Sequence, residues 1–330
     1  MTVRPNALSI PFRAAKAATS GNHARNLYLG VGAGLIVVIC WAGWIIATRS
    51  AVTTHLRPVD VAFLRYAVPT AILAPVLWRH GLGLGQIGLG RMFLLVSGAG
   101  LPFLMVASTG MRFAPVSDVG AVMVATMPVF VAVFSAVLGG ERFDRMRVAG
   151  FAVVIAGVVG IAAHGLFDGA AGAWRGHLLF LVGAALFATY TVTLRRSGLN
   201  PWHAAAIVNF YSLLVLAPIY FGLCGSELLA APPREVITQA AMQGVVTGVV
   251  ALFMYGEAVR RLGASRAAVL GSLTPVFVAL LGIPLLGEFP ARVTWLAIIA
   301  VSFGVILASG AFSRAASAPR LAHRPARNRS

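Results

Sequence analysis

The chain has 330 residues and a formal net charge of +17, yet only 11% of its residues are charged and 59% are hydrophobic. Soluble domains carry about 25% charged residues, so a soluble fold could not bury this much apolar surface. The basic residues stand in tails and short loops without interleaved aromatic residues, which excludes a nucleic-acid partner. The composition favours an integral membrane protein whose basic segments attract anionic lipid headgroups.

The N-terminal residues 1–28 are polar and include four basic residues, so they are expected to form a disordered cytoplasmic tail. A basic stretch before an apolar run is also typical of a signal peptide. The run at 29–48 is long enough to be retained as a first transmembrane helix. Residues 313–330 are predicted to form a second disordered, basic, cytoplasmic tail.

Ten apolar runs are close to the roughly 20 residues that a helix needs to cross the hydrocarbon core. Backbone groups in lipid must be satisfied within the segment, so these runs are predicted to be helices. The predicted spans are 29–48, 59–78, 92–111, 118–139, 148–166, 178–194, 203–223, 236–256, 267–287 and 293–312. The predicted fold class is all-α integral membrane, with five-helix repeats at 29–166 and 177–312 around a central cavity.

The distribution of basic residues predicts the orientation. With the N-terminus in the cytoplasm, 19 basic residues fall in cytoplasmic segments and seven fall on the other side. Cytoplasmic loops of membrane proteins carry an excess of Lys and Arg. Both termini are therefore predicted to be cytoplasmic, which requires an even number of spans.

The two halves share an internal repeat. The segment 127–132, Met-Pro-Val-Phe-Val-Ala, recurs at 274–279 as Thr-Pro-Val-Phe-Val-Ala, and a Gly-Glu pair follows at the same offset of 147 residues. Five spans per copy is an odd number, so the copies are predicted to lie in opposite orientations. Inverted repeats are typical of secondary transporters, whose two halves open a cavity alternately to each side.

The repeated motif, together with Arg65 in Phe-Leu-Arg-Tyr and the pair Trp41 and Trp44, resembles the ten-helix EamA type of the drug/metabolite transporter superfamily. The resemblance covers about residues 29–310. It implies an inner-membrane carrier, usually an exporter of small metabolites or drugs, although importers occur in the wider superfamily. The second copy departs from the pattern, because nothing basic corresponds to Arg65 and Glu288 is followed by Phe-Pro.

Two matched pairs of motif residues are predicted to support the conformational change. Pro128 and Pro275 lie within apolar spans, where proline removes a backbone hydrogen bond, and are predicted to form kinks or hinges. Glu141 and Glu288 end their spans on opposite sides of the membrane. Each glutamate is predicted to gate one side by pairing with a nearby arginine.

Arg65 lies about two turns into the second span, and three roles are open to it. It could bind an anionic group, pair with Asp60 or Asp118, or extend to the lipid headgroups.

The cavity is expected to be lined by aromatic and uncharged hydrogen-bonding residues, each of which could equally pack helices together. The candidates are Trp41, Trp44, Ser108, Thr109, Thr126, Tyr190, Asn209, Gln243, Thr247, Tyr255 and Thr274. This set places no ionisable group at the middle of the membrane, which favours a neutral, zwitterionic or amphiphilic solute. Asp118, Glu257 and His203 are the candidates for proton coupling, and a uniporter or an exchanger is an open alternative.

The predicted function is secondary active transport of a small-molecule substrate by alternating access, with export as the favoured direction. A metabolite importer or exchanger of the same fold is the alternative. An intramembrane enzyme or a receptor-like protein is less supported, because the chain contains no His-Glu-x-x-His, Gly-x-Ser-x-Gly or phosphate-binding Gly-x-x-x-x-Gly-Lys motif. No cofactor and no metal site are predicted, and the choice between monomer and homodimer is left open.

Overall fold

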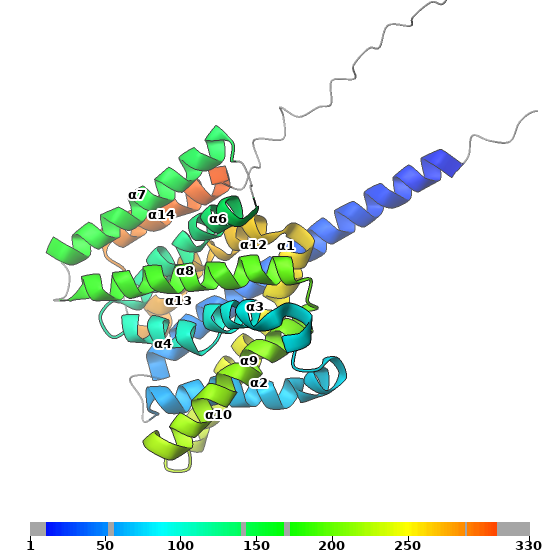
Figure 1. The fold of residues 1–330 in the computed structure, drawn as a ribbon. Coiled ribbons are helices and arrows are strands. Elements are labelled where there is room, and N and C mark those ends of the chain that lie inside the picture. The colour runs from blue at the N-terminus through cyan, green and yellow to red at the C-terminus, as the bar shows by residue number, and fades with distance from the viewer. Residues whose placement is uncertain (1–10, 52–55, 140–142, 168–171, 288, 309–330) are drawn as a thin grey trace, which may run out of the picture.

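The computed structural model describes residues 11–51, 56–139, 143–167, 172–287 and 289–308, and every regular element in these ranges is a helix. The helices form one bundle, from which the N-terminal part of α1 projects (Figure 1). Eight helical runs in the described ranges are long and apolar enough to cross a membrane: Ala24–Ser50, Val59–His80, Leu84–Gly110, Val116–Leu138, Ala173–Ser197, Pro201–Leu223, Pro233–Leu262 and Ala264–Leu286. The chain is therefore a multi-pass membrane protein, and the count of ten spans stays a prediction.

The elements divide into two sets of similar length, in which η denotes a π-helical segment. The first set is α1 (Pro11–Ala51), α2 (Pro58–His80), α3 (Leu84–Ala99), α4 (Leu101–Gly110), α5 (Val116–Asp118), η1 (Val119–Val124), α6 (Ala125–Gly139) and α7 (Arg145–Phe167). The second set is α8 (Ala173–Ser197), α9 (Pro201–Ile219), η2 (Tyr220–Cys224), α10 (Pro233–Gln239), η3 (Ala240–Ala251), α11 (Leu252–Leu262), α12 (Ala264–Gly271), α13 (Thr274–Leu286) and α14 (Arg292–Ala308).

The first helix is longer than the sequence predicts. It begins at Pro11, inside the stretch expected to be a disordered tail, and runs without interruption to Ala51. Alanine has the highest helix propensity, and the sequence from Arg13 to Ala18 is rich in it. The remaining parts of the two predicted tails, 1–10 and 313–330, lie outside the described residues.

Five of the predicted spans change geometry along their length, and one of them, 203–223, ends in the π-helical segment η2. The backbone breaks at Gly100 between α3 and α4, and again at Ser272 and Leu273 between α12 and α13. The other two spans contain the π-helical segments η1 and η3. Irregular backbone is tolerated at membrane depth only inside the protein or around a cavity, so these segments point to the functional region.

The matched prolines both follow such an irregular segment. Pro128 lies within α6, shortly after η1 ends, and its neighbours on both sides are helical. Pro275 lies in the first turn of α13, where a missing N–H breaks no hydrogen bond. The helix therefore breaks at Ser272 and Leu273, before Pro275 is reached, and the proline does not form the expected mid-helix kink. A Cβ on Gly120 would lie only 2.9 Å from Cα of Pro275, so η1 packs directly against this turn.

The last helix of each set packs against the other at the edge of the bundle (Figure 1). The contact depends on Gly150 of α7 and Gly304 of α14. A Cβ added to Gly150 would lie 2.4 Å from the carbonyl oxygen of Gly304. Only small residues permit backbones to approach this closely in a membrane bundle.

Candidate functional site

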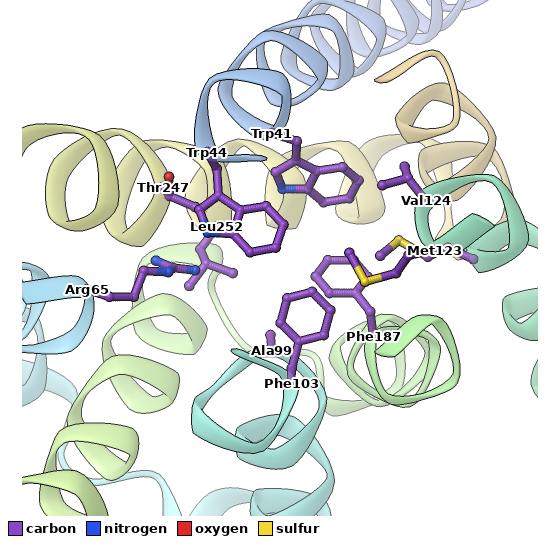
Figure 2. A pocket seen from close by; sticks show the side chains of 11 residues that line it. Trp41, Trp44, Arg65, Ala99, Phe103, Met123, Val124, Phe187, Thr247 and Leu252 are labelled. Carbon is purple, nitrogen blue, oxygen red and sulfur yellow. The ribbon is translucent and has the colours of Figure 1, made fainter. Parts of the chain in front are cut away.

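A cavity lies among the irregular segments, between helices of the two halves (Figure 2). The empty space among its lining side chains, including the part open to solvent, is about 400 Å³. The residues that line it are Trp41, Trp44, Arg65, Ala99, Phe103, Met123, Val124, Met127, Phe187, Thr247 and Leu252. Ala99 directly precedes the break at Gly100, Met123 and Val124 belong to η1, and Thr247 belongs to η3.

Four aromatic rings contribute to the cavity wall. The Trp44 ring lies 5.9 Å from that of Phe103, and the Trp41 ring meets Phe187 edge-on at 5.1 Å. Behind Trp41, the rings of Tyr190 and Tyr255 lie 6.1 Å apart and extend the same cluster. The wall can therefore contact an apolar or aromatic solute through ring faces and edges.

Arg65 brings a charge into this apolar wall. Its side chain points from α2 toward the cavity and is only 4% exposed (Figure 2). One guanidinium nitrogen, Nη1, donates to the backbone oxygen of Gln243 at 3.3 Å, whereas Nε has no partner. The suggested extension to the headgroups is therefore wrong, and the cavity wall, expected to carry uncharged side chains, contains one ionisable group.

The acids suggested as partners of Arg65 are bound elsewhere. Asp60 accepts the hydroxyl of Tyr220 at 2.6 Å and lies 3.1 Å from Nε of Arg57. The carboxylate of Asp118 lies 2.9 Å from Nε2 of His177. Neither pairing predicted for Arg65 forms.

Several candidate lining residues instead hold the irregular backbone together. Thr126 donates to the Val122 carbonyl at 2.7 Å, and Thr274 donates to the Gly271 carbonyl at 2.6 Å. The amide of Asn209 donates to Gly248 of η3 at 2.9 Å. These hydrogen bonds satisfy carbonyl groups at the helix breaks and in the π-helical segments. The side chains of Thr126, Thr274 and Asn209 do not line the cavity.

The remaining candidates lie at various distances from the cavity. Gln243 donates to the Thr48 hydroxyl at 3.0 Å, and Tyr255 shares a 2.8 Å hydrogen bond with Thr191. Tyr190 is buried in the aromatic cluster, Ser108 is half-buried, and Thr109 is exposed. Of the eleven candidates, Trp41, Trp44 and Thr247 reach the cavity wall.

The three candidates for proton coupling have different surroundings. Asp118 and His177 form a buried pair at the N-terminal side of η1, and Nδ1 of His177 has no partner. Glu257 lies 2.7 Å from both Arg260 and Arg261 near the end of α11. His203 contacts the carbonyl of Gly81 at 2.9 Å. The Asp118–His177 pair directly precedes η1, which contributes Met123 and Val124 to the cavity wall.

The two predicted gating glutamates, Glu141 and Glu288, lie outside the described residues. Among the described residues, no group of three or more His, Cys, Asp or Glu side chains could hold a metal ion.

Sequence reasoning missed most of the apolar lining and the partner of Asp118. The missed residues are Ala99, Phe103, Met123, Val124, Met127, His177, Phe187 and Leu252. Apolar residues that face a cavity look the same in a sequence as those that face lipid. Trp41 and Phe187, which occupy corresponding places in the two first helices of the repeat, were the available signal.

Comparisons with known proteins agree with this architecture. Residues 28–163 and, separately, 174–310 match the model of the EamA-like transporter family. The "Uncharacterized inner membrane transporter YedA" of Escherichia coli K12 is 27% identical over 191 residues, which are 58% of this chain and 61% of the relative. The same values hold for YedA of E. coli O157:H7, so the match spans less than two thirds of these relatives.

The fold also has a counterpart among solved structures. A crystal structure of another protein superposes with a TM-score of 0.60 at 21% sequence identity, covering 87% of this chain and 98% of the other. This similarity concerns the fold alone. Because the family model matches most of the residues, and matches them twice, the chain belongs to the EamA-like transporter family.

Proposed function

We propose that this protein is a secondary transporter that exports small metabolites or drugs across the inner membrane by alternating access. Ten spans would form two inverted five-helix halves, with both termini in the cytoplasm. The observation that carries the proposal is the cavity itself. Trp41, Trp44 and Phe103 from the first half face Phe187 and Thr247 from the second, so a movement between the halves changes the site.

The positions of the irregular segments support the inverted arrangement. In a five-plus-five alignment, the broken third span of the first half corresponds to the span that contains η3. The fourth span, which contains η1, corresponds to the broken α12–α13 span. Discontinuous helices at corresponding places around a central site are a recurring feature of transporters built from inverted repeats.

Different contacts close the two sides of the cavity. Toward the predicted external side, Gln243 bonds to Thr48 and the Gln239 amide donates to the Ala47 carbonyl at 3.1 Å. Toward the predicted cytoplasmic side lies the aromatic cluster that includes Trp41 and Tyr255, whose rings are 5.4 Å apart. These two layers would serve as the two gates.

The pair formed by Asp118 and His177 supports proton coupling. Both side chains are buried, and Ser117 donates to the other carboxylate oxygen of Asp118 at 3.3 Å. Of the elements that contact α5 or the pair itself, α1 carries Arg49 near its end, α8 carries Arg175 two residues before His177, and α13 carries no charged residue. A change of protonation here would act directly on η1, whose residues line the cavity.

The proposal is tested by labelling single cysteines from each side of the membrane. Thr247→Cys and Met123→Cys would be made in a chain whose Cys40 and Cys224 are replaced by alanine. Both cysteines should react with an impermeant maleimide added to either side of the membrane. An inward or outward solute gradient should change the ratio of the two labelling rates. Reaction from one side only, or protection from both sides under every gradient, would rule out alternating access.

The direction of transport is tested separately, in proteoliposomes loaded with radiolabelled solutes. If the protein is an exporter, solute should move faster from the side of the membrane that carries the termini to the other side. Protease protection would show on which side of the liposome membrane the termini lie. An importer would show the opposite preference, and an exchanger would require solute on both sides.

A further inference from the structure

We infer that Arg65 is the anion-binding residue of the cavity and that the transported solute carries a carboxylate, or an equally compact anionic group, on an apolar body. The inference rests on the proposed function, since it names the class of solute that the same cavity would carry.

Arg65 is buried without a counterion in the part of the chain that the structure describes. Its side chain is 4% exposed, and none of the ion pairs formed between described residues includes it. Asp60 and Asp118, the acids expected near it, are held by other partners. Burying an unpaired charge has a large desolvation cost, which a ligand of opposite charge offsets.

The guanidinium of Arg65 keeps hydrogen-bond donors available. Nη1 contacts one backbone carbonyl, that of Gln243, and the buried Nε makes no hydrogen bond. A guanidinium can present two parallel N–H groups to a carboxylate, which gives both strength and orientation. Figure 2 shows this end of Arg65 directed toward the space between Trp44 and Leu252.

The backbone of η3 makes room for the Arg65 side chain. A Cβ on Gly248 would lie 3.2 Å from Nη1 of Arg65, and a Cβ on Gly244 would lie 3.2 Å from the Leu64 carbonyl oxygen. These two glycines let η3 approach α2 closely. The guanidinium is thereby positioned by backbone and not by another charged side chain, so its charge stays available to the cavity.

The remaining wall decides what else the solute must carry. Trp44, Phe103 and Phe187 offer apolar ring surface next to the charge. A bare inorganic anion would leave this surface unfilled, and a purely apolar solute would leave the charge unpaired.

The test compares two probes that differ only in charge. Binding of 3-phenylpropanoate and of 3-phenylpropanamide to the full chain in lipid nanodiscs would be measured by calorimetry at neutral pH. The unmodified protein should bind the carboxylate at least about tenfold more tightly than the amide. Equal binding of the two probes, or no binding of the carboxylate, would overturn the inference without any variant being needed.

Variants assign the preference to Arg65. Arg65→Gln should abolish the preference for the carboxylate over the amide. Arg65→Lys should keep part of this preference, because lysine retains the charge but lacks the planar guanidinium with its parallel N–H donors. Arg79→Gln, an exposed arginine at the other end of α2, should leave the preference intact. A preference that survives in Arg65→Gln would show that another group binds the anion and would overturn the assignment.

Failure of this inference differs from failure of the proposed function. If the probes show no charge preference while proteoliposomes still carry a neutral or cationic solute, the transporter stands and the role of Arg65 falls. Absence of flux for every solute class would refute transport itself.

Discussion

Nε2 of His177 lies 2.9 Å from the Asp118 carboxylate, in a pair that is buried at the point where α5 passes into η1. Replacing Asp118 with asparagine keeps the shape of the side chain but removes the carboxylate that the proposed proton coupling requires. We expect Asp118→Asn to lose the response of solute flux to an imposed pH gradient, measured in proteoliposomes with a fluorescent pH indicator.

The matched control for this prediction is Glu257→Gln. Glu257 is held by Arg260 and Arg261 near the end of α11, away from the cavity wall, so its replacement should leave the pH response in place. A pH response that persists in Asp118→Asn and disappears in Glu257→Gln would transfer the coupling role to Glu257.

Asp60 anchors the beginning of α2, and its loss should destabilise the bundle. Its fully buried carboxylate accepts from Tyr220 at 2.6 Å, from Nε of Arg57 at 3.1 Å and from the backbone N–H of Glu227 at 3.3 Å. The hydrogen bond between the Arg57 side chain and the Asp60 carboxylate raises the pKa of Arg57 above its usual value. Asp60→Asn should reduce the free energy of unfolding by about 2–4 kcal/mol, because a buried charged network loses its centre.

The comparison for this variant is Glu227→Gln in the same cluster. The Glu227 side chain is 52% exposed, and exposed pairs contribute about 0–1 kcal/mol. Thermal unfolding of the purified proteins in detergent should therefore separate the two variants clearly. Similar melting temperatures would mean that the buried bonds of Asp60 contribute little.

Hydropathy predicts the helices because a membrane leaves the backbone no alternative to helical hydrogen bonding. It does not predict where helices break. Gly98 and Gly100 are alike in the sequence, yet only Gly100 separates two helices, because the Ser212 hydroxyl accepts from the freed N–H of Leu101 at 3.1 Å. That contact joins segments more than a hundred residues apart, and no local pattern reveals it.

The cavity shows the same limit. Trp41 and Trp44 could be predicted to face the same side of the first helix because they are three residues apart, and their large rings suit a cavity wall. Thr126 and Asn209 were predicted to line the cavity because they are polar, yet their hydrogen bonds go to backbone carbonyls. The burial of Arg65 depends on where two glycines of η3 lie, and that placement is a property of the assembled bundle.

Gly150 should tolerate no side chain, whereas Gly160 on the same helix should. A Cβ at Gly150 would lie 2.4 Å from the Gly304 oxygen and 2.5 Å from the Ala308 nitrogen, so the helices would have to separate. At Gly160 a Cβ meets nothing within 4 Å. Gly150→Ala should cost about 1–3 kcal/mol, and Gly160→Ala should be neutral or slightly stabilising.

Thermal unfolding and detergent resistance would measure this difference. If Gly150→Ala were as stable as Gly160→Ala, α7 and α14 would not depend on the close approach of their backbones.

Trp41 should act as the main barrier on the predicted cytoplasmic side of the cavity. Its ring contacts Phe187 at 5.1 Å and Tyr255 at 5.4 Å, and such pairs contribute about 0.5–1.5 kcal/mol each. Trp41→Ala removes both pairs and should favour the cytoplasm-open form by about 1–3 kcal/mol. Labelling of Thr247→Cys from that side should then accelerate roughly 5- to 150-fold. Trp202→Ala, which removes a partly exposed ring stacked on Phe253 at 3.8 Å, should leave the rate unchanged. Equal acceleration by both variants would mean that general loosening of the bundle, and not an aromatic gate, controls access.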